Sequence, residues 1–245
     1  MDERRPQATG NIDVGSVHDM TAEEMVSLIA HEIRNHLAVI QGFGTELGKS
    51  WQRLSEATKE DSVRRMTERA RYLNTVVGNL LYMRRIEAGV AWQEAAVADL
   101  FELLRPLVGE LTDLTQEVRV EREAEPGRYF VHVDPQRLRQ ILTNLVLNAG
   151  RFAPGDSPVV LAVAARGDSI CLEVRDEGPG IPVDRRAEIF ERFTRLQEGG
   201  AGIGIGLFIS RELARSMDGD LWVEDHPAGG SGATFVCSFP AAEGQ

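Results

Sequence analysis

The sequence predicts an α+β protein in which an antiparallel hairpin of two long helices precedes an α/β sandwich. Two long stretches, from about Thr21 to Trp51 and from about Glu60 to Glu87, carry apolar residues every three or four positions, the period of an amphipathic helix. The segment between them is short, so the two helices should fold back on each other. Beyond Gly89, short alternating stretches interleave with helical ones, which is typical of a layered α/β domain.

The first helix is predicted from a capping signal and one apolar stripe. Thr21 followed three residues later by Glu24 forms a capping box, which satisfies backbone N–H groups at a helix start. The stripe consists of Met25, Leu28, Ile29, Leu37, Ile40, Leu47 and Trp51. One face of this helix should therefore be buried.

The second helix carries apolar residues that alternate by three and four positions, which is a heptad seam. This seam consists of Val63, Met66, Ala70, Leu73, Val77 and Leu80. Gly89 is a natural stop for the helix. A lone hairpin leaves apolar surface uncovered, so we expect two copies to pair as a dimeric four-helix bundle.

The rest of the chain is expected to form one domain of about 150 residues, a normal domain size. The expected helices are Asp99–Leu111, Pro135–Arg151 and Ile205–Ser216. The expected strands are Val118–Glu121, Tyr129–Val133, Val159–Ala164, Ser169–Arg175, Leu221–Glu224 and Thr234–Phe239. The predicted organisation is thus a tail at residues 1–20, the hairpin at 21–89 and the sandwich at 90–245.

Composition argues against several classes of protein. The 245-residue chain has a formal net charge of −11 and shows no segregated basic face, so a phosphate backbone would repel it and nucleic acid is not an expected partner. No apolar run reaches the roughly 18 residues of a membrane-spanning helix, and the first residues lack the apolar core of a secretion signal. A cytoplasmic chain is expected. Cys171 and Cys237 are expected to be buried thiols in strands.

The stretch DEGPGIP combines a carboxylate with glycines at the end of a predicted strand. Asp176 follows the strand directly, and Gly178 and Gly180 remove side chains beyond it. A flat ligand can then approach the backbone while the carboxylate accepts a hydrogen bond. A simple turn explains this stretch equally well.

Two further stretches flank predicted helices. In GIGIGL, Gly202, Gly204 and Gly206 precede a helix whose free N–H groups favour phosphate, although glycine-rich turns also occur without a ligand. In NLVLNAGRF, Asn144 and Asn148 share one face of an apolar helix, and their amides need partners there. A ligand or a neighbouring helix would satisfy them.

Together these stretches resemble the ordered boxes of the sensor histidine kinases of two-component systems, over about Thr21 to Phe239. HEIRN, within IAHEIRNHL, resembles the H-box, RIEAGV the end of the dimerisation domain, and NLVLNAGRF the N-box. DEGPGIP resembles the G1 box, IFERFTR the F-box, GIGIGL the G2 box, and GGSGATF the glycine turn before the last strand. The resemblance implies a dimeric helical hairpin followed by an ATP-binding sandwich of the type shared with gyrase and Hsp90.

The resemblance assigns the chemistry of the hairpin. It implies that His31 accepts the phosphoryl group, because a largely neutral imidazole is nucleophilic at neutral pH. It implies that Glu32 is the general base, and that Glu32 with Asn35 fits the family's pattern for dephosphorylating the response regulator. The family usually carries proline where His36 stands.

The resemblance also assigns a nucleotide site. It implies Mg²⁺ at Asn148, phosphates beside Asn144, and adenine at Asp176, with Arg151 and Arg195 offsetting phosphoryl charge. The full expected set is Asn144, Asn148, Arg151, Phe152, Asp176, Gly178, Gly180, Arg195, Gly202, Gly204, Gly206 and Thr234. Between Phe193 and Gly202 the stretch TRLQEGGA is shorter than the family's usual lid and lacks its basic run, so nucleotide affinity should be modest.

The expected partners are a second copy of the chain and the receiver domain of a response regulator. About 20 residues before the hairpin cannot form a sensor domain, so the chain is expected to be a catalytic fragment or a kinase that receives its signal from a separate sensor partner. The sequence leaves two other interpretations of the function open. One is a phosphotransfer or scaffold protein of this fold with weak or absent nucleotide binding, and the other is an ATPase or serine kinase of the same superfamily.

Overall fold

The protein is described here from a computed structural model. It describes residues 21–90, 95–114, 117–122, 129–155, 157–196, 202–227, 229 and 231–243. The predicted tail and most of the TRLQEGGA stretch lie outside the described residues.

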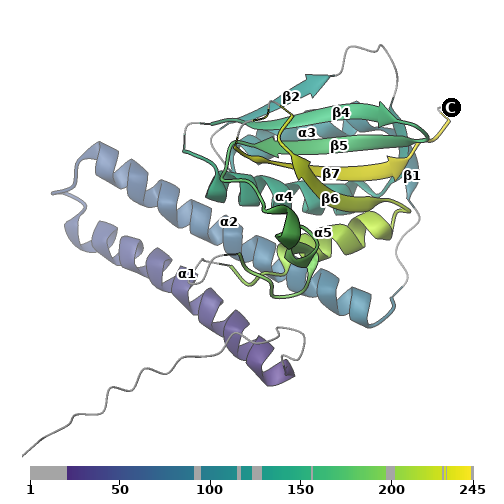
Figure 1. Ribbon diagram of the computed structural model, residues 1–245. Helices are drawn as coiled ribbons and strands as arrows, with labels where there is room; N and C mark the ends of the chain where they lie inside the picture. The colour runs from purple at the N-terminus through teal and green to yellow at the C-terminus, as the bar shows by residue number, and fades with distance from the viewer. Residues whose placement is uncertain are drawn as a thin grey trace, which may run out of the picture.

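The hairpin consists of α1 (Ala22–Ser50) and α2 (Glu56–Glu87), which run antiparallel (Figure 1). The predicted capping box is confirmed at the start of α1, where the Thr21 and Glu24 side chains each bond the other's backbone N–H. α2 begins four residues earlier than expected because the Ser55 hydroxyl accepts from the backbone N–H of Thr58. At its end Gly89 adopts φ +59°, the left-handed conformation that suits glycine.

The sandwich is built on a five-stranded mixed sheet in the order β2-β4-β5-β7-β6. Its strands are β2 (Val118–Arg122), β4 (Val159–Arg166), β5 (Ser169–Asp176), β6 (Asp220–Asp225) and β7 (Ala233–Pro240). β2 runs parallel to β4, and the other pairs are antiparallel. The expected strand near 129–133 is β3 (Phe130–Val133), which pairs outside this sheet with β1 (Ala96–Asp99), a strand that the sequence did not predict.

Three helices pack on one face of the sheet: α3 (Leu100–Thr112), α4 (Pro135–Phe152) and α5 (Gly206–Arg215). Their apolar side chains share one core with the inward residues of the strands, such as Leu172 of β5 and Cys237 of β7. Two short 3₁₀ turns, η2 (Val183–Arg185) and η3 (Glu188–Phe190), lie between β5 and α5. The predicted fold class, a helical hairpin followed by an α/β sandwich, is confirmed, and both cysteines are buried as expected.

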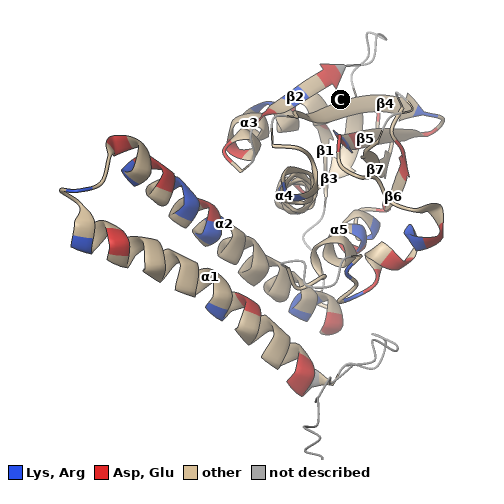
Figure 2. Cartoon of the chain, turned by 60° about the vertical axis from the view of Figure 1, so that its left-hand side comes forward, with Lys and Arg blue, Asp and Glu red and all other residues tan. Residues whose placement is uncertain are grey.

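The hairpin rests against the sandwich through α2, which lies between α1 and the helices α4 and α5 (Figure 1). Charged residues gather in the first half of α2, and none occurs from Leu73 to Met83, the stretch that lies nearest the sandwich (Figure 2). Met83 joins the main core, and Val76 packs with Ile203 and Ile205 from the glycine-rich segment. Apolar contact therefore holds the two parts together.

The heptad seam of α2 is partly open to solvent in the single chain, because Met66, Leu73 and Leu80 are half-buried and its other residues are exposed. Val63 and Val77 are about half exposed, and Leu81 beside them is 63% exposed. The residues of α2 that the chain itself buries lie on other faces: Ser62, Val76, Asn79 and Met83. The predicted pairing of two copies would cover this seam, and it stays a prediction. Within the described ranges, no helix combines the length and apolar character needed to cross a membrane.

Candidate functional site

A cavity of about 450 Å³ opens between the sandwich and α2. Most of the predicted nucleotide residues line it: Asn144, Asn148, Arg151, Phe152, Asp176, Gly180, Arg195, Gly202, Gly204 and Gly206. Gly178 and Thr234 are buried beside it, next to lining residues in the chain. His31, Glu32 and Asn35 lie outside it, on α1.

Asp176 lies at the end of β5 and lines the cavity. Its Oδ1 accepts from the backbone N–H of Gly178 at 2.8 Å and of Ala233 at 3.4 Å. Burial raises the pKa of the Asp176 carboxyl, and the two hydrogen bonds oppose that rise. A Cβ on Gly178 would lie 2.7 Å from Asp176 Oδ1, so only glycine leaves room for this arrangement.

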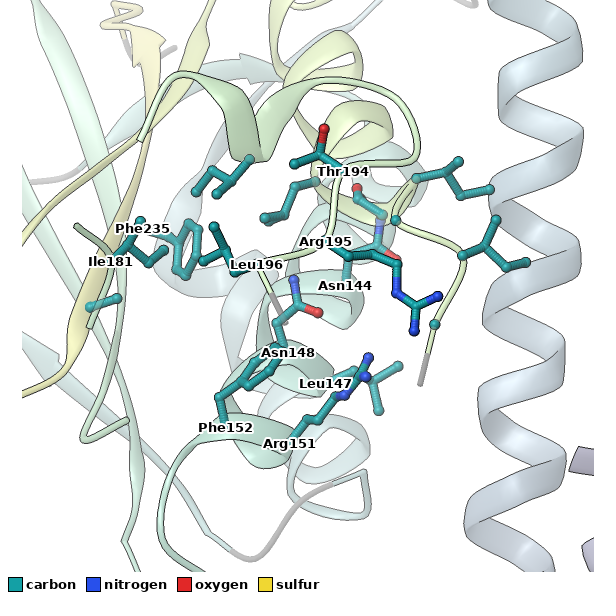
Figure 3. Close-up of a pocket in the computed structure, with 18 of the residues that line it drawn as sticks. Asn144, Leu147, Asn148, Arg151, Phe152, Ile181, Thr194, Arg195, Leu196 and Phe235 are labelled. Atoms are coloured by element: carbon teal, nitrogen blue, oxygen red, sulfur yellow. Dashed lines mark hydrogen bonds between the residues drawn. The ribbon is translucent and has the colours of Figure 1, made fainter. Parts of the chain in front are cut away.

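Asn148 and two arginines occupy the middle of the cavity (Figure 3). The amide of Asn148 points into the open space, and no hydrogen bond of that amide is recorded within the described part of the chain. Figure 3 shows the guanidinium groups of Arg151 and Arg195 extending to the same side. Desolvation lowers the pKa of Arg151, and the charge of Arg195 adds to the effect, which Tyr72 partly opposes. Two neighbouring cations attract anionic oxygens to this place.

The glycine-rich segment forms the wall between the cavity and the hairpin. Gly202 and Gly204 have φ +111° and +75°, and a Cβ on Gly204 would lie 2.7 Å from backbone atoms of both Phe193 and Thr194. α5 follows at Gly206 without a side-chain cap, so its first N–H groups are available to an anion.

Asn144 is not free in this arrangement. Its Nδ2 donates to Asn79 Oδ1 of α2 at 3.1 Å, and its Oδ1 accepts from Asn79 Nδ2 at 3.1 Å. Nδ2 also donates to the Ser210 hydroxyl and the Gly206 carbonyl. Gln140 donates to Asn79 Oδ1 at 2.9 Å. The sequence left open whether a ligand or a neighbouring helix supplies the hydrogen-bond partners of this amide. In this structure neighbouring helices supply them.

The polar residues of IAHEIRNHL divide between two faces of α1. His31 and Asn35 are exposed, whereas Glu32 and His36 are buried against α2. Glu32 Oε1 accepts from the backbone N–H of Gly202 at 2.6 Å. The carboxylate beside His31 is therefore bonded to the wall of the cavity.

Sequence reasoning missed the part that α2 plays. Tyr72, Thr75, Val76 and Asn79 of α2 line the cavity together with the predicted residues. The available signal was the uncharged stretch from Leu73 to Met83 on a helix that is otherwise highly charged, with two amides, Asn74 and Asn79, inside it. Such a stretch indicates contact with another element.

Two protein-family models match the chain. The family model described as "His Kinase A (phospho-acceptor) domain" matches residues 21–89. The model described as "Histidine kinase-, DNA gyrase B-, and HSP90-like ATPase" matches residues 133–243.

Curated relatives and solved structures are also similar. The adaptive-response sensory kinase SasA of Trichormus variabilis is 28% identical, covering 87% of this chain and 56% of its own length. The signal transduction histidine-protein kinase AfsQ2 of Streptomyces coelicolor is 31% identical, over 91% of this chain and 44% of its own. Full-length ShkA in complex with AMPPNP is 27% identical with TM-score 0.58, over 92% of this chain and 47% of its own.

The chain thus spans about half the length of these two relatives. The two family models cover the hairpin and the sandwich in turn, with the expected boxes in each. The chain belongs to the family of two-component sensor histidine kinases.

Proposed function

We propose that the protein is an ATP-dependent histidine kinase that phosphorylates itself on His31 and passes the phosphoryl group to an aspartate of a response regulator. The observation that carries this proposal is the convergence of Asp176, Asn148 and the arginine pair on one cavity. They match, box by box, the residues that the family resemblance assigns to adenine, metal and phosphates.

The cavity gives a nucleotide one orientation. Asp176 accepts the adenine amino group at one end, since its Oδ1 is already held by backbone N–H groups. The phosphates lie toward the uncapped start of α5 and the guanidinium groups of Arg151 and Arg195. Gly178 and Gly180 let the base approach the backbone.

Asn148 fits Mg²⁺. Its amide is directed into the cavity, and its oxygen would hold Mg²⁺, an ion that needs few protein ligands when it binds together with phosphates. The described residues contain no cluster of three or more His, Cys, Asp or Glu side chains that would hold a metal by themselves. This donor set suits an ion that arrives with the nucleotide.

His31 supplies the nucleophile. A ring nitrogen forms the new bond to the γ-phosphorus, the bond between the γ-phosphorus and the β–γ bridging oxygen breaks, and ADP leaves with that electron pair. Glu32 acts as general base for the ring proton. In this structure the sandwich is docked against α2, and His31 lies outside the cavity in this docked arrangement. Transfer therefore requires the sandwich to take another position, either on the hairpin of its own chain or on that of a second copy.

The hairpin also supports the partner roles. The open seam of α2 suits a homodimer, and the exposed side chains of His31 and Asn35 are accessible to a receiver domain. Asn35 would orient a water against an aspartyl phosphate and so remove the phosphoryl group from the regulator.

Phosphorylation with Mg-ATP tests the proposal. We expect an acid-labile phosphoryl group on the wild type and on His36→Gln, and none on His31→Gln or Asn148→Ala. Asn35→Ala should keep self-phosphorylation and slow regulator dephosphorylation. A wild type that binds no nucleotide, yet exchanges phosphoryl groups with a regulator, would contradict the kinase and support the phosphotransfer protein instead.

A further inference from the structure

Three hydrogen-bond donors converge on a single oxygen of Glu32. Oε1 accepts from the Gly202 backbone N–H at 2.6 Å, from the Tyr72 hydroxyl at 3.2 Å and from His36 Nε2 at 3.2 Å. Gly202 belongs to the sandwich, whereas Tyr72 and His36 belong to the hairpin itself. The two hairpin donors therefore stay with Glu32 whatever position the sandwich takes.

Tyr72 is a permanent donor. Burial and the charge of Glu32 raise the pKa of its hydroxyl, so the proton stays on it throughout the physiological range. The hydroxyl reaches Glu32 from α2 across the interface between α1 and α2. It fixes the carboxylate relative to a second helix, which residues of α1 cannot do alone.

His36 is held in one tautomer. Its ring stacks on Tyr72 with centroids 4.2 Å apart and planes 26° apart. Desolvation is the largest influence on the pKa of His36 and lowers it; together with the charges of Arg69 and Arg151 it outweighs the opposing effect of Glu32, so the ring is neutral near pH 7. Nδ1 is buried and has no partner, while Nε2 faces a carboxylate oxygen that only accepts. The proton must therefore be on Nε2.

We propose that Tyr72 and His36 are positioning residues that orient Glu32 for its work on His31. The inference rests on the proposed function, in which Glu32 is the base. Both donors engage Oε1, and no hydrogen bond to Oε2 is recorded in the described part of the chain, so Oε2 is the oxygen available to the imidazole. When nucleotide phosphates take the N–H groups of the glycine-rich segment, Gly202 releases Glu32 and these two donors keep its carboxylate in place.

This role explains the residue at the family's proline site. Proline has no side-chain donor, whereas His36 supplies one from the same turn of α1 as Glu32, four residues on. A leucine of similar bulk would fill the space beside Tyr72 without donating. Glutamine would donate from its amide without the ring.

Paired substitutions separate donation from packing. In the full chain, with Mg-ATP, we expect Tyr72→Phe and His36→Leu each to slow self-phosphorylation about tenfold, the effect of one hydrogen bond to a charged group. His36→Gln should restore most of the rate. Tyr82→Phe on the same helix and His132→Leu on β3 are the matched controls and should leave the rate unchanged.

A cycle with Glu32→Ala tests whether the effect passes through Glu32. Tyr72→Phe should slow the wild type but cause no further loss in Glu32→Ala. Equal rates of self-phosphorylation in the wild type, Tyr72→Phe and His36→Leu would overturn the inference without contradicting the proposed kinase activity. A faster rate in His36→Leu than in His36→Gln would do the same. An unlabelled wild type would overturn the proposed function and the inference with it.

A spectroscopic measurement checks the geometry without any activity. The ¹⁵N shifts of His36 in the wild type at pH 7 should report a proton on Nε2 and a bare Nδ1. The opposite tautomer would overturn the inference because Nε2 would then have no proton to donate.

Discussion

Asp176 shows how the fold prepares one carboxylate for a single hydrogen bond. It is the last residue of a buried strand, two backbone N–H groups donate to its Oδ1, and burial raises the pKa of its carboxyl. The other oxygen has no bond recorded within the described residues. A buried acceptor of this kind selects a ligand that brings its own N–H.

Substitution of Asp176 by asparagine should weaken nucleotide binding about 10- to 100-fold. The amide oxygen of the new asparagine must accept from the backbone donors, so its NH₂ group turns toward the adenine amino group, which cannot accept from it. The charge-assisted hydrogen bond that is lost is worth about 1.5–3 kcal/mol. Titration with a fluorescent ATP analogue measures the change. Glu177→Gln, at the exposed neighbouring position, is the control, and equal affinity for both variants would remove Asp176 from the site.

His36 should make stability depend on pH just below neutrality. Desolvation lowers its pKa in the folded protein, so the unfolded chain binds a proton first as the pH falls through 6.5, and that proton favours unfolding. His36→Gln should therefore lose less stability than the wild type between pH 7.5 and pH 5.5, as measured by urea unfolding. His132→Gln, at an exposed histidine, should behave like the wild type. An undiminished pH dependence in His36→Gln would exclude His36 as its source.

At the scale of elements, α2 carries two apolar faces with different partners. One contains Val76 and Met83 and is covered by the chain itself, and the other contains Val77 and Leu81 and is open. Surface of this kind on a helix marks an interaction with another molecule.

Glutamate on the open face should separate the predicted dimer. In Val77→Glu and Leu81→Glu a charge would have to be buried between two copies, so we expect at least tenfold weaker association. Sedimentation over a range of concentrations measures this. Val120→Glu, at an exposed apolar residue of β2, should leave association unchanged. Dimers of undiminished strength in both hairpin variants would place the contact elsewhere.

Most elements were predictable because their signals are local. The capping box at Thr21, the apolar period of α4 and the alternation of β5 each lie within one short window. β1 was missed because four residues are too short to establish a period, and its pairing with β3 is made only in the folded chain. The start of α2 was misplaced because the Ser55 cap precedes the apolar seam.

Most of the residues predicted for the nucleotide site line one cavity, and their role there stays a prediction, but their contacts were not predictable. Glycines and amides in ordered boxes identify candidates, yet the partner of Asn144 is Asn79, 65 residues away on another part of the molecule. In the same way Glu32 meets Gly202 across 170 residues. No local period encodes such contacts, since they depend on how the hairpin and the sandwich are arranged.

At the scale of the whole molecule, the docked arrangement occupies two groups that the proposed reaction needs. Glu32 is bonded to Gly202, and Asn144 is bonded to Asn79. Two ion pairs accompany them at the same boundary, between Arg71 and Asp113 and between Arg192 and Glu87. Exposed ion pairs contribute little free energy, so the buried amides and the apolar contacts should supply most of the free energy that holds the sandwich against the hairpin.

Loss of the Asn79 amide should loosen this docking. Asn79→Ala leaves Asn144 and Gln140 without a shared partner in a buried place, at a cost of about 1–3 kcal/mol. We expect hydrogen exchange in residues 72–83 of α2 to accelerate about tenfold or more, while the core strand β5 keeps its protection. Asn74→Ala, at an exposed position of the same helix, is the control. Unchanged exchange in Asn79→Ala would show that apolar contact alone maintains docking.

The cavity has walls from both parts of the chain, with Tyr72 and Thr75 on α2 facing Asn148 and Asp176 of the sandwich. A small molecule shaped to fill it completely would contact both parts at once. Such an inhibitor would fit only the docked arrangement, so it would trap the protein there rather than merely compete with the nucleotide. Because its affinity would depend on side chains of α2 outside the family's boxes, it would discriminate between kinases whose nucleotide-binding residues are alike.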